Sequence, residues 1–242
     1  MTYLRTASVV AFDLDDTLFP ESQFVWGGLR AVSCLLSDRG VTDCFLTTAW
    51  ELYRSGFRGL LINETLSRLG IPLGSGTLMS ELIDCYRYHT PTIQLHDDAR
   101  LLLNSLAEKQ VPLALVTNGG ARIQEGKMRA LGIIESFRVA IFCQDRGEEW
   151  LKPSLLPFRQ VMEVLSGYQP TSYVYIGDHP TKDFAGARGC GWRTIRVHRE
   201  GTMYGSPERM GDSDADVVIR SFYELQVPRH HEGAVRIAAS EV

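Results

Sequence analysis

Short apolar runs alternate with amphipathic helical segments along most of this 242-residue chain. The runs have the apolar, β-branched character of buried strands and lie at 7–12, 111–116, 138–142, 173–176, 193–197 and 216–219. Segments with helical periodicity lie between them, at 97–109, 121–131, 155–165 and 183–190. Strands that alternate with helices in this way predict an α/β fold, in which helices cover both faces of a parallel sheet.

The segment 18–95 breaks the alternation directly after the first strand. Its apolar residues recur at helical spacing in four stretches that glycines punctuate, 24–36, 45–53, 60–69 and 78–88. We therefore expect a Rossmann-like α/β core made of residues 1–17 and 96–225, with an inserted all-helical domain at 18–95. The polar segment 226–242 is expected to be a C-terminal tail.

Charge and composition exclude several classes of protein. The formal net charge is −4, so the chain lacks the basic footprint of a protein that binds a nucleic acid polymer. No apolar run approaches the roughly 20 residues that cross a membrane, and no secretory signal peptide is visible. The 5 cysteines are far apart and form no CxxC pair, which favours reduced thiols and a cytoplasmic location.

Polar residues gather where three of the expected strands end. Asp13 and Asp15 follow the first strand, Thr117 and its neighbours follow the second, and Asp178 follows a later one. In open parallel sheets these strand ends share one edge, where ligands bind. Carboxylates that meet there repel one another, and a divalent cation relieves the repulsion. Because hard carboxylate oxygens favour magnesium, we expect a Mg²⁺ site at this edge.

The other residues at this edge suit a phosphoryl group. Lys152 adds a positive charge, Thr117 a hydroxyl, and Asn118 and Gly119 backbone N–H donors. A carboxylate can attack phosphorus and form an aspartyl-phosphate, while a second carboxyl exchanges protons with the leaving oxygen and with water. The pattern therefore indicates phosphoryl transfer, with a separate role for each of two aspartates.

Four motifs in this sequence resemble, in order, those of the haloacid dehalogenase-like superfamily of hydrolases. They are Asp13-Leu14-Asp15-Asp16-Thr17, Val116-Thr117-Asn118-Gly119, Lys152-Pro153 and Gly177-Asp178-His179-Pro180-Thr181-Lys182-Asp183. The resemblance implies that Asp13 is the nucleophile, Asp15 the general acid/base, and Thr117 the residue that binds the phosphoryl oxygens. It also implies that Lys152 holds both Asp13 and the phosphoryl charge in place.

The same resemblance implies a metal site and a cap. Asp13, the backbone carbonyl of Asp15, and Asp178 would ligate Mg²⁺, with Asp183 in or just behind the metal shell. The helical block 18–95 would be the cap that closes over the site and shapes specificity. Dehalogenases of the superfamily lack an aspartate at the position of Asp15, so this chain resembles the phosphatase branch.

The expected substrate is a small phosphorylated metabolite, such as a sugar phosphate or a nucleoside monophosphate. Arg54 and Arg58 are four residues apart and would share one helix face if their helix continued through Gly56. They would then either hold a second anionic group of the substrate or form a solvated face.

Several alternatives stay open at this point. A phosphomutase would use the same residues, and a 2-haloacid dehalogenase or a non-catalytic binding protein would share the fold. A signalling receiver domain also combines acidic residues, a threonine and a lysine around magnesium, but it has no helical insertion after its acidic pair. The sequence is compatible with a monomer or a homodimer.

Overall fold

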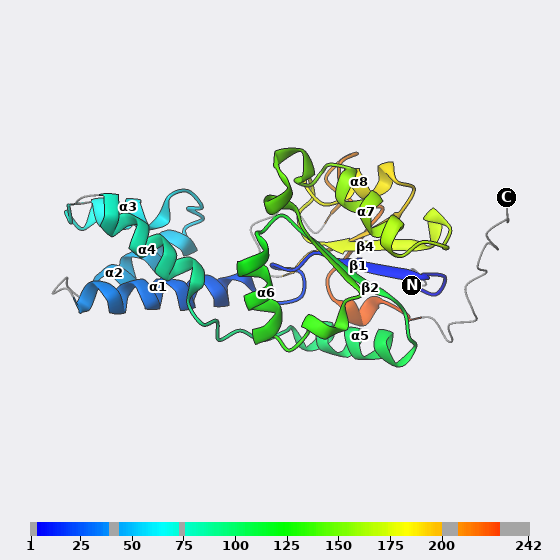
Figure 1. The fold of residues 1–242 in the computed structure, drawn as a ribbon, viewed down its shortest axis with the longest axis horizontal. Helices are drawn as coiled ribbons and strands as arrows, with labels where there is room; N and C mark the ends of the chain where they lie inside the picture. The colour runs from blue at the N-terminus through cyan, green and yellow to red at the C-terminus, as the bar shows by residue number, and fades with distance from the viewer. Residues whose placement is uncertain (1–3, 39–43, 73–75, 200–207, 228–242) are drawn as a thin grey trace. The chain divides into compact units, whose positions relative to one another are not determined.

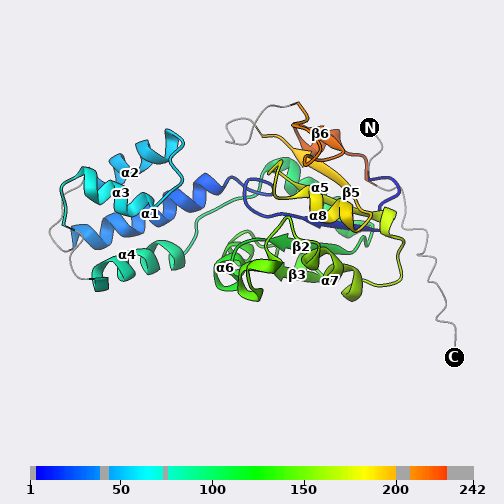
Figure 2. The same cartoon turned by 90° about the horizontal axis from the view of Figure 1, so that it is seen from above.

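The computed structural model describes residues 4–38, 44–72, 76–199 and 208–227. Within them, one parallel sheet has the strand order β3-β2-β1-β4-β5-β6 (Figures 1 and 2). In chain order the strands are β1 (Val9–Phe12), β2 (Leu113–Thr117), β3 (Val139–Phe142), β4 (Tyr173–Gly177), β5 (Arg193–Val197) and β6 (Val217–Ile219). The predicted α/β fold with a parallel sheet is confirmed.

Helices cover both faces of this sheet. In Figure 1, α7 (Leu156–Val164) and α8 (Phe184–Gly189) lie on one face, and α5 (Asp97–Glu108) lies on the other. Phe158 of α7 and Phe184 of α8 pack against Tyr175 of β4. A further helix, α6 (Ala121–Ala130), follows β2. Because apolar side chains cover both faces, strands β1, β2 and β4 are buried along their whole length.

A buried polar cluster joins α5 to the segments that follow β5 and β6. The Asp98 side chain of α5 accepts hydrogen bonds from Arg199 (3.0 Å), the Ser221 hydroxyl (2.6 Å) and the backbone N–H of Phe222 (2.8 Å). Arg199 also donates to the backbone carbonyl of Thr17, 3.2 Å away. All three donors bind one oxygen of this buried carboxylate, Oδ2, and Arg199 also holds Thr17, so this cluster fixes the segment that follows Asp13.

The chain divides into two compact units. Unit 1 comprises residues 1–20 and 95–242, and unit 2 comprises residues 21–94. Leu18 and Phe19 are fully buried, and the His96 N–H donates to the Leu18 carbonyl (2.9 Å). Both segments that connect the two units are therefore attached to unit 1. The inserted unit is thus shorter than the expected block 18–95. Of the expected tail 226–242, residues from 228 onward lie outside the described residues.

Unit 2 contains α1 (Glu21–Ser37), α2 (Cys44–Arg54), α3 (Leu61–Arg68) and α4 (Gly76–Tyr88), and no strand occurs among its described residues. Two adjacent glycines in the middle of α1 allow α4 to pack closely. A Cβ on Gly27 would lie 2.6 Å from Nε2 of His89, and a Cβ on Gly28 would lie 2.6 Å from the ring of Tyr86. An interior glycine costs a helix about 0.5–1 kcal/mol, and the close contact offsets that cost here.

Candidate active site

Asp13 lies at the carboxyl end of the central strand. Its backbone N–H donates to the carbonyl of Ile176 in β4 (2.9 Å), so the chain is still extended at this residue. Strands β2 and β4 flank β1, and they end at Thr117 and Gly177. The three predicted polar clusters therefore meet at one edge of the sheet, as the parallel arrangement requires.

A tight loop follows Asp13 and turns the chain back on itself. The Leu18 N–H donates to the Leu14 carbonyl (3.0 Å), and Asp15 forms an isolated parallel bridge with Phe19. Asp16 lies inside this loop with φ at +54°, a left-handed conformation that aspartate tolerates better than most residues. Leu14 and Leu18 are fully buried, so the loop is anchored by its apolar residues while Asp15 remains partly exposed.

Lys152 is the centre of a buried ion cluster. Its Nζ lies 2.6 Å from Oδ1 of Asp13, 2.6 Å from Oδ1 of Asp183 and 2.8 Å from the Tyr175 hydroxyl. Burial alone would lower the pKa of Lys152, but the charges of Asp13 and Asp183 outweigh it and hold the pKa above its usual value. The ammonium group is therefore a fixed positive charge beside Asp13.

The Asn118 side chain holds the backbone of Lys152. The Lys152 N–H donates to Oδ1 of Asn118 (2.8 Å), and Nδ2 of Asn118 donates to the Lys152 carbonyl (3.3 Å). The side chain of Asn118 thus positions the lysine, and only its backbone N–H remains for the predicted contact with a phosphoryl group. Gly186 of α8 makes room for the same segment, since a Cβ there would lie 2.5 Å from the Pro153 carbonyl oxygen.

Three buried carboxylates, those of Asp13, Asp178 and Asp183, converge at this point. One oxygen from each lies within 4.8 Å of the others. Burial raises the pKa of Asp13 to about 7, with Lys152 opposing the shift and Asp183 adding to it. Burial, followed by the charges of Asp183 and Asp13, raises the pKa of Asp178 well above its usual value. Because a divalent cation would relieve this repulsion, the donor set suits Mg²⁺.

Asp183 is held in this cluster through its second oxygen. The backbone N–H of His179 donates to Oδ2 of Asp183 (2.8 Å), and Oδ1 faces Lys152. The carboxylate also lies against Gly177, where a Cβ would be 2.4 Å from Oδ2. The glycine before Asp178 is thus required by the position of Asp183.

Sequence reasoning missed three side chains at this edge. The Tyr175 hydroxyl contacts Lys152, and two residues of α6, Gln124 and Lys127, contact Asp15. Nothing in the sequence marked Tyr175 as a site residue, because it is an ordinary residue of an apolar strand. Gln124 and Lys127 lie on a helix that follows the second motif, and their spacing of three places them on one helix face. That spacing was available in the sequence, but it did not indicate that this face is buried.

The condition under which Arg54 and Arg58 would share a helix face, a helix that continues through Gly56, is not met. Helix α2 ends at Arg54, and Gly56 has a φ of +94°, so the two arginines do not share a helix face. The Arg58 guanidinium turns back within unit 2, where it donates to the carbonyls of Tyr53 and Phe57 and lies 3.8 Å from the centroid of the Tyr53 ring. These contacts satisfy carbonyls near the end of α2.

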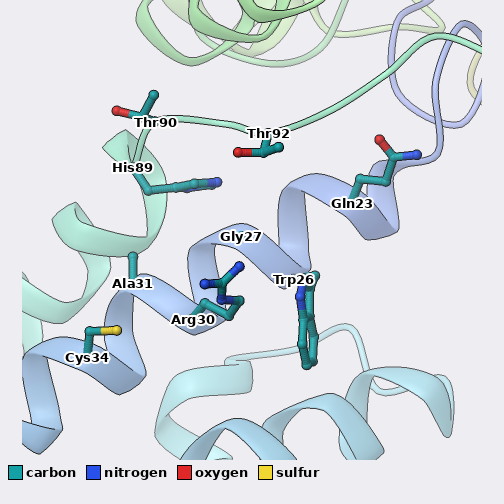
Figure 3. Close-up of a pocket in the computed structure, with 9 residues that line it drawn as sticks. All are labelled: Gln23, Trp26, Gly27, Arg30, Ala31, Cys34, His89, Thr90 and Thr92. Atoms are coloured by element: carbon teal, nitrogen blue, oxygen red, sulfur yellow. The ribbon is translucent and has the colours of Figure 1, made fainter.

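Unit 2 contains a pocket of its own, with a volume of about 410 Å³ (Figure 3). Arg30 of α1 and His89, which follows α4, both point into it, and Thr90 and Thr92 line the facing segment. Gln23 lies at one end, where its side chain accepts a hydrogen bond from the backbone N–H of Gln94 (2.7 Å). The lining therefore combines apolar residues, among them Trp26 and Ala31, with polar side chains and the permanent cation of Arg30.

Comparison with known proteins identifies the family. The model of the haloacid dehalogenase-like hydrolases matches residues 10–197, which is more than half of the chain. This chain belongs to that family. The match covers all four motifs and the inserted helical unit.

Several curated relatives are phosphatases by name. A glyceraldehyde 3-phosphate phosphatase of Methanopyrus kandleri is 27% identical, over 96% of this chain and 98% of that protein. A phosphoserine phosphatase of Thermus thermophilus is 27% identical, over 76% of this chain and 72% of its own length.

Solved structures share the fold. A magnesium-bound hydrolase of the family from Bacillus subtilis matches with a TM-score of 0.60 and 20% identity, over 93% of this chain and 97% of that chain. The same fold occurs in proteins described as a 2-haloacid dehalogenase and a β-phosphoglucomutase, so the fold alone does not decide the reaction. Among the described residues, no helix is both long and apolar enough to cross a membrane.

Proposed function

We propose that this chain is a magnesium-dependent phosphatase that hydrolyses a small phosphorylated metabolite through an aspartyl-phosphate on Asp13. The observation that carries the proposal is the buried cluster in which Lys152 lies 2.6 Å from both Asp13 and Asp183, at the edge where Asp178 and Thr117 also lie. A cluster with one fixed cation and three carboxylates suits a dianionic phosphoryl group only together with a metal ion.

Asp13 is suited to act as the nucleophile. An oxygen of its carboxylate attacks phosphorus, and the bond from phosphorus to the leaving oxygen breaks as the aspartyl-phosphate forms. The neighbouring ammonium of Lys152 favours the ionised form of Asp13, which opposes the effect of burial on its pKa. Asp13, Asp178 and the backbone carbonyl of Asp15 would hold Mg²⁺, with Asp183 in or beside the metal shell. The bound cation supplies neutralising charge for these carboxylates and for the phosphoryl oxygens.

Asp15 is suited to move the protons. It donates a proton to the leaving oxygen in the first step and takes one from the attacking water in the second, which releases phosphate and restores Asp13. The Thr117 hydroxyl and the backbone N–H groups of Asn118 and Gly119 supply donors for the phosphoryl oxygens. Displacement of a halide needs no proton donor, so the presence of Asp15 favours a phosphatase over a dehalogenase.

The named activities of the relatives support a small phosphate ester as substrate. Glyceraldehyde 3-phosphate and phosphoserine are both three-carbon monophosphates. We therefore place such three-carbon esters first in the substrate range, ahead of larger sugar phosphates and nucleoside monophosphates.

The test is phosphate release from a panel of these esters, measured with Mg²⁺ and with EDTA. The wild type is expected to release phosphate only with Mg²⁺, and Asp13→Asn is expected to release none, because an amide is a poor nucleophile. Asp97→Asn, the same chemical change at an exposed residue of α5, serves as the matched control and should keep wild-type activity.

A rapid acid quench during turnover should trap labelled phosphate on the wild type and none on Asp13→Asn. Turnover by Asp13→Asn would refute the nucleophile. Isomerisation of a sugar phosphate without net phosphate release would assign the same residues to a mutase, and release of halide from a 2-haloacid would assign them to a dehalogenase.

A further inference from the structure

The Asp15 carboxylate is bound by two side chains from one helix. Nζ of Lys127 lies 2.6 Å from Oδ1 of Asp15, and Nε2 of Gln124 lies 2.9 Å from Oδ2. Both donors are buried, since Gln124 is 1% and Lys127 4% exposed, whereas the Asp15 side chain is 24% exposed. A buried ammonium and a buried amide are costly unless they have partners, so their placement beside Asp15 is a specific feature of this fold.

Gln124 also connects Asp15 to the second motif. Its Nε2 donates to the Thr117 hydroxyl oxygen at 2.7 Å, so the two N–H bonds of one amide serve Thr117 and Asp15 together. This arrangement depends on Gly119, where a Cβ would lie 2.5 Å from Cδ of Gln124. The glycine of the second motif therefore leaves the space through which Gln124 reaches both residues.

Lys127 contacts the other end of the loop as well. Its Nζ lies 5.9 Å from the centroid of the Phe19 ring, and the backbone of Phe19 forms the isolated bridge with Asp15. One lysine therefore lies against both ends of the segment 15–19. Because Gln124 and Lys127 are three residues apart on α6, a single helix face holds the carboxylate and the loop that carries it.

We propose that Gln124 and Lys127 are positioning residues, which hold the Asp15 carboxylate in one orientation and in register with the Thr117 hydroxyl. The proposal rests on the function proposed above, in which Asp15 moves the protons. Proton transfer requires the carboxylate oxygen to lie within hydrogen-bond reach of the reacting group. Each carboxylate oxygen has a second lone pair, so Asp15 can still accept a proton from water while both donors remain bound.

The pair acts on Asp15, so its loss should lower kcat more than it changes KM. Lys127→Met and Gln124→Met keep the approximate length of each side chain and remove its hydrogen bonds. We expect each to lower kcat about 10- to 100-fold, the effect of misplacing a reacting group by about 1 Å, with KM changed by less than about threefold. Lys127→Arg keeps the charge and the donors and should recover most of the lost rate.

The matched control is Arg129→Met, which removes a cation from the same helix. Arg129 is exposed and pairs with Glu125 (2.8 Å), away from Asp15, so this variant should keep the wild-type kcat. The melting temperature of every variant is measured beside its kinetics. The probe substrates are phosphoserine and p-nitrophenyl phosphate. They differ in the leaving group, since nitrophenolate needs a proton from Asp15 far less than the serine oxygen does.

The deciding experiment repeats Lys127→Met in an Asp15→Asn background, because Lys127 donates to Asp15, whereas Gln124 donates to Thr117 as well. A residue that acts through Asp15 loses its effect once Asp15 is gone, so Lys127→Met should then change kcat by less than about twofold. The same loss in both backgrounds would show a merely structural role and overturn the proposal. Full kcat for Lys127→Met and Gln124→Met in an active wild-type background would also overturn it and leave the phosphatase assignment intact. A wild type that releases no phosphate would instead refute the proposed function, and the positioning role with it.

Discussion

The buried Asp13 carboxylate should make the metal-free protein less stable as the pH rises. The pKa of Asp13 is about 7 in the folded chain, against an ordinary value of 3.8. Between about pH 4 and pH 7 the folded chain therefore keeps a proton that the unfolded chain has released. Stability is fully present below pH 4 and is lost progressively up to pH 7. A shift of about 3 pKa units corresponds to about 4 kcal/mol above pH 7.

Asp13→Asn removes this titration, so the stability of this variant relative to the wild type should be higher at alkaline pH than at acid pH. Urea unfolding of both proteins in EDTA, at pH 5 and at pH 8, gives the comparison. Between these two pH values Asp13 accounts for about 2.5 kcal/mol of lost stability. The variant should therefore gain about that much relative to the wild type. Asp178 is present in both proteins, so the difference reports on Asp13 and on its coupling to that residue.

Two further observations make the comparison decisive. Asp97→Asn, at an exposed position, should follow the wild type at both pH values. Mg²⁺ at about 100 times its dissociation constant should stabilise the wild type by about 2.7 kcal/mol and the variant by much less, because the variant lacks one anionic ligand. Parallel curves for the wild type and Asp13→Asn between pH 5 and pH 8 would refute the reasoning, because they would show that burial does not hold a proton on Asp13.

Four other substitutions test charge and packing in unit 1. Lys152→Met should lower kcat about 10²- to 10³-fold, because it removes the fixed charge at the phosphoryl group, and a loss below about threefold in steady-state assays would contradict that role. Asp98→Asn breaks a buried ion pair and should cost about 3–5 kcal/mol in urea unfolding, a cost that the exposed Asp97→Asn should not share. Gly186→Ala places a Cβ 2.5 Å from the Pro153 carbonyl oxygen and should lower both the melting temperature and kcat. Gly126→Ala, at a helical glycine with open space, should be neutral or stabilising by up to about 1 kcal/mol, and equal losses in the two alanine variants would refute the steric argument.

The positions of the strands and of the motif residues followed from the sequence because they depend on local patterns. Buried parallel strands are short apolar runs, and a polar residue directly after such a run lies at the edge of the sheet. Asp13, Thr117 and Asp178 could be placed in this way, each from its own strand. The helical unit was visible for the same reason, since its periodicity interrupts the alternation. Its boundaries were less certain because Leu18 and Phe19 pack into unit 1.

The interactions among side chains could not be predicted in the same way. Arg58 illustrates the difference, because its spacing from Arg54 would give a shared helix face only in a helix that continues through Gly56, whereas α2 ends at Arg54 and Gly56 has a left-handed backbone. Asn118 is a second case, since the motif marks it for the substrate but its side chain binds the Lys152 backbone, 34 residues away. In both cases a local pattern was compatible with more than one set of partners.

By itself the sequence determined the α/β fold, the inserted helical block and the edge of the sheet where the motif residues meet, because hydrophobic periodicity and strand order are properties of short segments. Only the tertiary structure decided that Lys152 also contacts Asp183, and that Gln124 and Lys127 bind Asp15 from α6. The partners of Asp15 are 109 and 112 residues away in the chain. Contacts between residues so far apart in the chain depend on how a helix packs beside a strand. A charged side chain is buried beside its partner only when the whole sheet is assembled.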